Sequence, residues 1–503
     1  MANNLEKPHR SLLFGTTAAI LIGFGVYIGA AFFLDLHPFH LKHLNLYNPL
    51  VTAGLWGATL SGTLSNLLGA PRLIGALAEE KVLPSFFVGR KAILLTALIA
   101  FSGFFIGDLN RIALLLSMFF LVSYGMINFA TGIEALIRNP SWRPLINTPW
   151  VISMAGGIMC AIVMLLIDPA LTLIAIALVS IIFFIMKRRT APLPGWEDMR
   201  HSILLFLSRY AVYNLANANT SPRNWRPNLL VFIGGQKERP HLTHLTTALT
   251  HKKGFLTYAS IVKEDIETTQ TTLLEYLANN NASSLITVKQ SPEIYDGMCH
   301  LIENYGLGPI TPNTIVLGVT KDPAKFTTYS RVINACYTQK KNIVLVQENG
   351  FERRMQTKNR LKKQKIIDVW WGGQSKENSE LMILLAHMLS TSEQWRGACL
   401  TLKTAVTTET DIEALKKELS AFGEKGRFDI QTKIVPHEPG TDPFANTLYN
   451  SSKEADLVFL GLRAPDENFA TYYATLLEKT ENFPPLAFVL AGETLDFTQI
   501  LSN

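Results

Sequence analysis

The sequence has little charge for its length. Only 17% of its 503 residues are Asp, Glu, Lys or Arg, whereas 48% are hydrophobic; soluble domains carry about 25% charged residues. A large apolar region must therefore be hidden from water. The net charge of +6 is small, and the sequence shows no cluster of basic residues such as a nucleic-acid-binding surface needs. We therefore expect no nucleic-acid partner.

Cysteine is scarce as well, and familiar catalytic motifs are missing. The four cysteines form no CxxC pair and indicate free thiols in a reducing compartment: Cys160, Cys299, Cys336 and Cys399. The chain lacks GxGxxG, the P-loop GK[ST] and the nucleophile motif GxSxG. Three histidines (His241, His244 and His251) have no acidic or cysteine partner at a metal-ligand spacing. We expect neither an enzyme nor a metal site.

Long apolar runs fill the first part of the chain instead. Each is near the roughly 20 residues that cross a bilayer, and the runs cover residues 11–34, 49–78, 92–108, 112–136, 149–167 and 169–186. The first run is too long for a signal peptide. Asp168 and Pro169 form a turn between the last two runs, because proline cannot continue a helix. The pattern predicts a membrane domain over residues 1–190 with six spanning helices.

Lysine and arginine in the loops predict the orientation of these helices. Ten of these Lys and Arg residues fall in loops on one side of the membrane, and only Lys42 and Arg111 fall on the other side. Because positive loops stay inside, we predict a multi-pass protein of the plasma (inner) membrane with both termini in the cytoplasm. Membrane lipid is its first expected partner.

The spanning runs carry few charges, so they contain no proton relay and no voltage sensor. Any ions would be bound by hydroxyls, carbonyls and helix ends. One stretch has small residues every four positions, at Gly57, Ser61, Ser65 and Gly69. Such a stripe lets a neighbouring helix approach closely. Alternatively, the carbonyls of Ala58 and Ser61 and the Ser61 hydroxyl ligate a small cation.

The second part of the chain has a different pattern. Residues 191–226 predict a linker with an amphipathic helix at 198–217. Residues 227–503 alternate short β-branched runs with helical ones, which predicts a cytosolic α/β domain with a doubly wound, mainly parallel sheet. It is one domain or two similar lobes split near residue 364. The ten predicted strands cover 228–234, 256–262, 284–289, 313–319, 342–347, 365–371, 397–406, 428–435, 455–462 and 485–492.

One feature of this domain suggests a nucleotide. Gly234 and Gly235 follow a predicted strand, and Lys252 and Lys253 come soon after. Glycines at a strand end with lysines nearby can hold a phosphate. The alternative is a solvated turn with surface lysines.

Several segments resemble the cation–chloride cotransporters, which belong to the amino acid–polyamine–organocation superfamily. The segment GATLSGTLSNLLGAPRLIGALAEEKVLP is similar to the eighth membrane helix of that family and its following loop. LLLSMFFLVSYGMINFATGIEALIRNPSWRP is similar to the tenth helix, and KPHRSLLFGTTAAILIGFGVYIG to the seventh. SPRNWRPNLLVFIGG, KIIDVWW and ADLVFLGL resemble parts of the family's cytoplasmic domain.

The resemblance implies a transporter with twelve helices, of which this chain holds the equivalents of helices seven to twelve. The cytosolic domain would then be similar to universal stress proteins and serve regulation and homodimerisation. Tyr124 corresponds to a tenth-helix tyrosine that donates to chloride. Ala58 and Ser61 correspond to sodium ligands of the eighth helix, and Gly62 stands where the family has a second serine. That loss favours the sodium-independent, potassium–chloride branch.

Two hypotheses follow. The leading one is the C-terminal half of an electroneutral potassium–chloride cotransporter in a split or truncated form. A separate chain would then supply the first six helices, and this chain alone is expected to carry no flux. The alternative is a membrane-anchored regulatory or nucleotide-sensing α/β protein without transport activity. A third reading, an amino acid permease, is disfavoured by the cytosolic domain. No cofactor is expected beyond the transported potassium and chloride ions, and a nucleotide would be bound only if the site at Gly234 and Gly235 is real.

Overall fold

A computed structural model of the whole chain divides into two compact units, Met1–Tyr210 and Ala211–Asn503. The structure describes residues 8–492 except 37–48, 80–82, 85, 87–88, 103–104, 106–107, 138–141, 145, 190–193, 219–223, 235–238, 251–253, 281, 362–363, 373–374, 407–411, 414–429 and 438–446.

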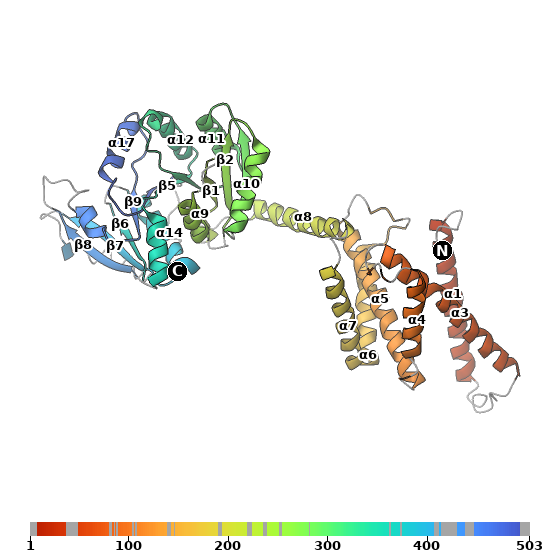
Figure 1. Cartoon of the computed structure of the whole chain (residues 1–503). Helices are drawn as coiled ribbons and strands as arrows, with labels where there is room; N and C mark the ends of the chain where they lie inside the picture. The colour runs from red at the N-terminus through yellow and green to blue at the C-terminus, as the bar shows by residue number, and fades with distance from the viewer. Residues whose placement is uncertain are drawn as a thin grey trace. The chain divides into compact units, whose positions relative to one another are not determined.

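The first unit is helical, and each predicted apolar run forms a helix (Figure 1). The helices are α1 (Pro8–Leu36), α3 (Pro49–Glu79), α4 (Arg90–Ser102), α5 (Leu109–Ile137), α6 (Trp150–Ile167) and α7 (Pro169–Arg189). The predicted turn between the last two is confirmed. The Asp168 carboxylate accepts from the backbone N–H groups of Ala170 and Leu171 at 2.8 and 3.0 Å, and so caps α7.

The prediction of six spanning helices is only partly supported. Among the described residues, three helices are long and apolar enough to cross a membrane: Phe14–Phe33, Ile112–Ile137 and Trp150–Ile167. The apolar part of α7, Pro169–Phe184, is shorter, and α4 has only 13 residues. Helix α3 is 31 residues long, but its glycines, hydroxyls, Asn66 and Arg72 lower its hydropathy. Within the residues that the structure describes, the other three helices do not reach the length and hydropathy of a span.

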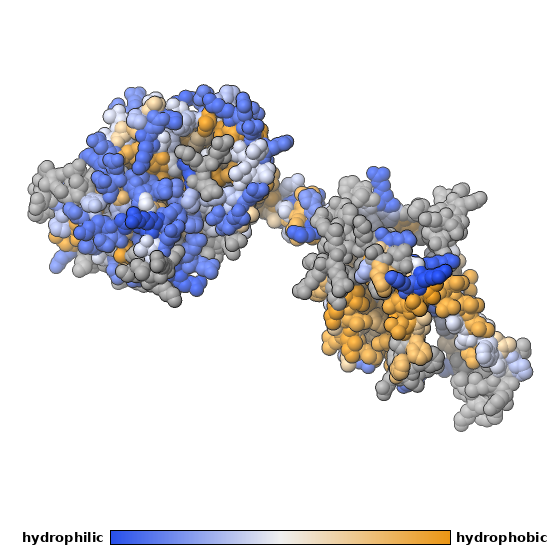
Figure 2. Space-filling view, in the orientation of Figure 1, coloured by the Kyte–Doolittle hydropathy of each residue, from blue (hydrophilic) through white to orange (hydrophobic). Residues whose placement is uncertain are grey.

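The surface of the first unit is apolar over most of its helices (Figure 2). Large hydrophobic side chains point away from the unit on all its helices; Tyr27, Leu94 and Leu166 are 79%, 69% and 79% exposed. Exposed apolar area of this extent marks surfaces that contact lipid or other protein segments. The arrangement agrees with a membrane environment.

Helix α8 (Pro194–Asn217) covers the helix predicted at 198–217, but its apolar residues are spread around the helix, so the amphipathic pattern is not confirmed. The two compact units divide within it, between Tyr210 and Ala211. The predicted linker 191–226 therefore includes a helix whose first part belongs with the membrane helices.

The second unit is the predicted α/β domain, and all ten predicted strands are present. They are β1 (Leu229–Phe232), β2 (Leu256–Val262), β3 (Leu285–Gln290), β4 (Thr314–Gly318), β5 (Asn342–Gln347), β6 (Ile366–Trp370), β7 (Cys399–Val406), β8 (Ile430–Pro436), β9 (Leu457–Gly461) and β10 (Leu486–Leu490). The helices between them are α9 (Pro240–Thr250), α10 (Ile266–Asn279), α11 (Ile294–Asn304), α12 (Phe326–Thr338), α13 (Phe351–Leu361), α14 (Lys376–Ser390), α16 (Asn450–Ser452) and α17 (Phe469–Lys479), with short 3-10 turns η5 (Pro323–Lys325) and η6 (Glu393–Trp395).

The strands form one sheet in the order β3-β2-β1-β4-β5-β10-β9-β6-β7-β8. Neighbouring strands are parallel except β5 and β10, which pair antiparallel from Leu486 opposite Gln347 to Leu490 opposite Ile343. Strands β1–β5 and β6–β10 therefore repeat one topology in two lobes joined at their last strands. The division predicted near residue 364 is confirmed, since β6 begins at Ile366.

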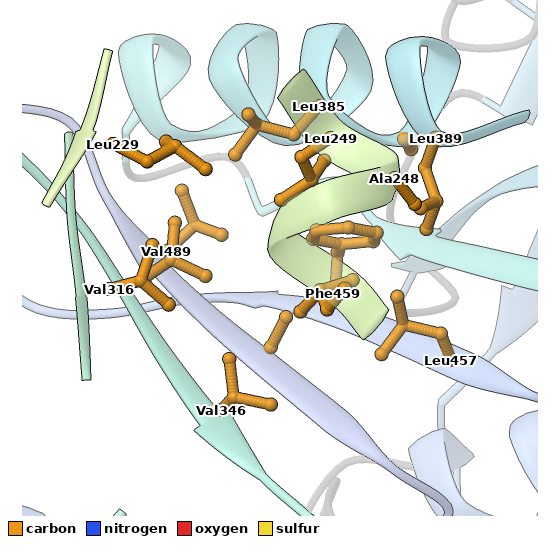
Figure 3. Close-up of a cluster of buried hydrophobic side chains, with 14 of the residues drawn as sticks. Leu229, Ala248, Leu249, Val316, Val346, Leu385, Leu389, Leu457, Phe459 and Val489 are labelled. Carbon is orange, nitrogen blue, oxygen red and sulfur yellow. The ribbon is translucent and has the colours of Figure 1, made fainter. Parts of the chain in front are cut away.

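Both faces of the sheet are covered by helices from both lobes. On one face α9 packs against α14, and side chains such as Leu249 and Leu385 meet Val316, Phe459 and Val489 from the strands (Figure 3). On the other face α12 packs against α17. The central strands are buried on both faces, as expected for a parallel sheet covered by helices. Each face of the sheet thus has its own hydrophobic core, and both lobes contribute to it.

Candidate functional site

The candidate cation positions lie on α3. Ala58, Ser61 and Gly62 are exposed and lie within about one turn of one another, as the helical period requires. The hydroxyls of their neighbours are turned back onto the helix: Thr59 donates to the Leu55 carbonyl oxygen at 2.8 Å. This part of α3 therefore offers the Ser61 hydroxyl on an open face.

The predicted close packing of the small-residue stripe is not seen. A Cβ added at Gly57, Gly62 or Gly69 would meet nothing within 4 Å in the described part of the chain. Helix α3 packs mainly against α4. The stripe therefore faces open space in this structure, and its packing prediction is wrong for the described helices.

Close helix packing occurs instead between α5 and α6, where no packing was predicted from the sequence. A Cβ at Gly157 would lie 3.0 Å from the Phe129 ring, and one at Gly132 would lie 2.8 Å from the Met154 sulfur. Gly125 approaches Cys160 in the same way, at 3.3 Å. Gly125 and Gly132 are seven residues apart, which places them on one face of α5. That seven-residue spacing is the feature of the sequence that could have predicted close packing on α5.

Tyr124, the candidate chloride donor, lies on α5 beside this packed face. Its ring stacks on Phe120 with 6.4 Å between centroids, and its carbonyl oxygen accepts from the Asn128 amide at 2.9 Å. The side chain is 59% exposed, and within the described residues its hydroxyl has no hydrogen-bond partner. A hydroxyl in that state can donate to an anion.

The structure does not bring these positions into one site. Ala58, Ser61 and Gly62 are on α3, which packs on α4, whereas Tyr124 is on α5, which packs on α6 and α7. Cation and anion positions thus belong to separate helix groups.

The candidate nucleotide site lies at the carboxyl end of β1. Gly234 has φ +72°, a conformation that favours glycine. Gly235, Lys252 and Lys253 lie outside the described residues. Strands β2 and β4 flank β1 on opposite sides, so the strand order reverses at β1, and parallel sheets form ligand crevices at such points. Nucleotide binding stays a prediction.

Each lobe has a switch point of this kind, and a different side chain lies beside it in each lobe. In the first lobe the Arg239 guanidinium lies over Gly318 at the end of β4, leaving no room for a Cβ. In the second lobe Asn378 takes the equivalent place beside Gly461, at the end of β9. Its amide donates to the Leu462 carbonyl at 2.8 Å and accepts from the Ala491 N–H at 2.7 Å. The second crevice is therefore closed by internal hydrogen bonds.

Two of the three histidines pair with acids that the sequence analysis did not identify. His241 Nδ1 lies 3.6 Å from Glu348 and His244 Nδ1 lies 3.2 Å from Glu352. Burial lowers the pKa of His241, and Glu348 opposes that shift. Within the described residues, no three His, Cys, Asp or Glu side chains are grouped so as to hold a metal ion.

Comparison with known proteins extends over both units. The amino acid permease family model matches residues 1–230, and the solute carrier family 12 model matches residues 239–359. Cation-chloride cotransporter 2 of Oryza sativa subsp. japonica is 26% identical over 471 residues, covering 86% of this chain and 45% of that protein. Human solute carrier family 12 member 2 is 30% identical over 297 residues, covering 55% of this chain and 24% of that protein. These matches support the resemblance of this chain to the cation–chloride cotransporter family.

The chain spans about half the length of the cation–chloride cotransporters that it matches over 86% of its own length. Among solved structures, the cytoplasmic domain of a prokaryotic cation chloride cotransporter aligns with a TM-score of 0.41 at 17% identity, covering 55% of this chain and all of that one. A universal stress protein from Archaeoglobus fulgidus aligns with a TM-score of 0.35 at 13% identity, covering 53% of this chain and 97% of that one.

Proposed function

We propose that this chain forms the ion-carrying and regulatory part of an electroneutral potassium–chloride cotransporter. The observation that carries the proposal is the similarity to cation–chloride cotransporters, which runs through the membrane helices into the α/β unit. The same relatives therefore match the helical unit and the α/β unit in the same order along the chain. A membrane-anchored regulator alone would not require similarity in the helices.

The chemistry of the helices fits ions held by neutral groups. The Tyr124 hydroxyl is a donor without a trapping positive charge, which suits a monovalent anion that must be released again. Gly62 provides no hydroxyl next to Ser61, so the cation site keeps fewer oxygen ligands than a small, strongly hydrated ion such as sodium demands. Potassium and chloride moving together would carry no net charge.

Rubidium uptake tests this proposal in cells that express the chain together with the first six helices of the family. We expect Tyr124→Phe to reduce chloride-dependent uptake, because a hydrogen bond to a charged partner contributes about 1.5–3 kcal/mol. Ser61→Ala should leave uptake largely unchanged and sodium-independent. Uptake that depends on sodium and is abolished by Ser61→Ala would contradict the potassium–chloride assignment, as would indifference to Tyr124→Phe.

The proposed regulatory role of the α/β unit includes dimerisation and nucleotide binding, and two measurements separate them. Sedimentation of residues 211–503 should show a dimer. Calorimetry with millimolar ATP should show binding only if the crevice after Gly234 holds a phosphate. A monomer with ATP bound would favour the nucleotide-sensing alternative over a dimerising domain.

A further inference from the structure

A cavity of about 860 Å³ opens at one end of the first unit. The end of α5, the connection to α6 and one side of α8 form its wall, and all of these belong to the same compact unit. The lining residues are Ala135, Leu136, Ile137, Trp142, Pro144, Asn147, Thr148, Pro149, Trp150, Phe206 and Arg209.

The cavity lies at the ends of two helices that are long and apolar enough to cross a membrane. The apolar span of α5 ends at Ile137, and that of α6 begins at Trp150. Trp142 and Trp150, which are 39% and 44% exposed, line the cavity between them. Tryptophan gathers at this depth because its ring is apolar and its N–H is a hydrogen-bond donor. The cavity therefore opens at the headgroup layer.

The described lining of the cavity carries a single charged side chain. Arg209 is the only ionisable residue among the described residues that line it. Its guanidinium carbon lies 5.7 Å from the centre of the Phe206 ring, over the ring face. Asn147 and Thr148 add uncharged polar groups to the same wall.

We propose that this cavity binds the phosphate of an anionic membrane phospholipid. Arg209 would pair with the phosphate, since a guanidinium matches two phosphate oxygens at once. The tryptophans and the apolar ends of α5 and α6 would receive the glycerol and the start of the acyl chains. A soluble anion would satisfy only the arginine and leave the apolar wall wet. The side is the predicted cytoplasmic one, where anionic lipids are concentrated.

Native mass spectrometry of the full chain tests the proposal, with phosphatidylglycerol or phosphatidylcholine added at equal concentration. We expect phosphatidylglycerol adducts to be retained in preference to phosphatidylcholine. Arg209→Gln should weaken phosphatidylglycerol binding about fivefold, as expected for one arginine at an anionic surface. Arg200→Gln is the matched control, because Arg200 is exposed on the same helix and does not line the cavity; it should change binding by less than half as much.

Three results would overturn the proposal. Equal effects of Arg200→Gln and Arg209→Gln would indicate general surface attraction, and equal binding of both lipids would exclude a phosphate-selective site. Displacement of the lipid by millimolar inorganic phosphate would indicate a site for free anions. If Arg209→Gln does not elute as a folded protein, Phe206→Leu removes the ring beneath the guanidinium without changing charge. That variant should lower lipid retention at least twofold, and unchanged retention would count against the site.

Discussion

Lys403 and Asp368 form a buried ion pair inside the second lobe. Their side chains are 6% and 2% exposed, and Lys403 Nζ lies 2.5 Å from Asp368 Oδ2. The ammonium also donates to the Ser451 carbonyl at 2.6 Å. Strands β6 and β7 carry the pair, since Asp368 is opposite Thr401 in the register. The pair therefore joins the strands to the segment before β9.

Removing one member of this pair should destabilise the second unit strongly. Lys403→Met leaves a carboxylate buried without its partner, and we expect a loss of about 3–5 kcal/mol in the free energy of unfolding. Urea unfolding of residues 211–503 measures it.

The double variant Lys403→Met with Asp368→Leu is the control. It replaces the pair by apolar side chains and should recover most of the loss, because desolvation offsets much of a buried pair's attraction. Equal instability of single and double variants would mean that the pair itself, not the orphaned charge, stabilises the lobe.

Among helices, the glycines of α5 and α6 decide how the first unit packs. Where lipid replaces water, helices associate through close van der Waals contact rather than through the hydrophobic effect. Gly125, Gly132 and Gly157 permit that approach, with side chains of the opposite helix within 3.3 Å of their missing Cβ atoms. Hence α5 and α6 behave as one packed pair.

Gly157→Leu should lower the thermal stability of the detergent-solubilised protein. The new side chain must displace the Phe129 ring, and overpacking of this kind costs about 1–3 kcal/mol. Heating followed by size-exclusion chromatography gives the midpoint temperature.

The same change at Gly57 is the matched control. Nothing lies within 4 Å of a Cβ there, so Gly57→Leu should leave the midpoint nearly unchanged. A larger effect at Gly57 than at Gly157 would show that α3 packs closely in the folded protein and would restore the original prediction for its stripe.

For the whole molecule, the main open prediction is topology. The loop charges predict that a reporter fused after Arg189 is cytoplasmic and that one inserted between His37 and Lys42 is external. The second position lies outside the described residues. Helices α5 and α6, which are long enough to span, lie between the two positions, so reporters on opposite sides require an odd number of crossings among α3, α4 and α7. Both reporters on one side would exclude six crossings.

Local patterns in the sequence determined the elements of this protein. Runs of β-branched residues predicted all ten strands and the division between the lobes; the inner runs are mostly apolar because those strands are covered by helices on both faces. Apolar length predicted the six helices, and Asp168-Pro169 predicted the break between two of them. Tyr124, Ser61 and Gly62 were identified through resemblance, without a geometry.

Tertiary structure decided which elements meet. The antiparallel pairing of β5 with β10 joins strands about 140 residues apart, and neither run shows its partner in its own composition. The glycines that pack were those of α5 and α6, not the more regular stripe of α3, because close approach depends on what lies opposite. Lys403 and Asp368 each resemble surface residues in sequence, yet the fold buries them together. Contact between distant residues is a property of the folded chain, and local periodicity does not contain it.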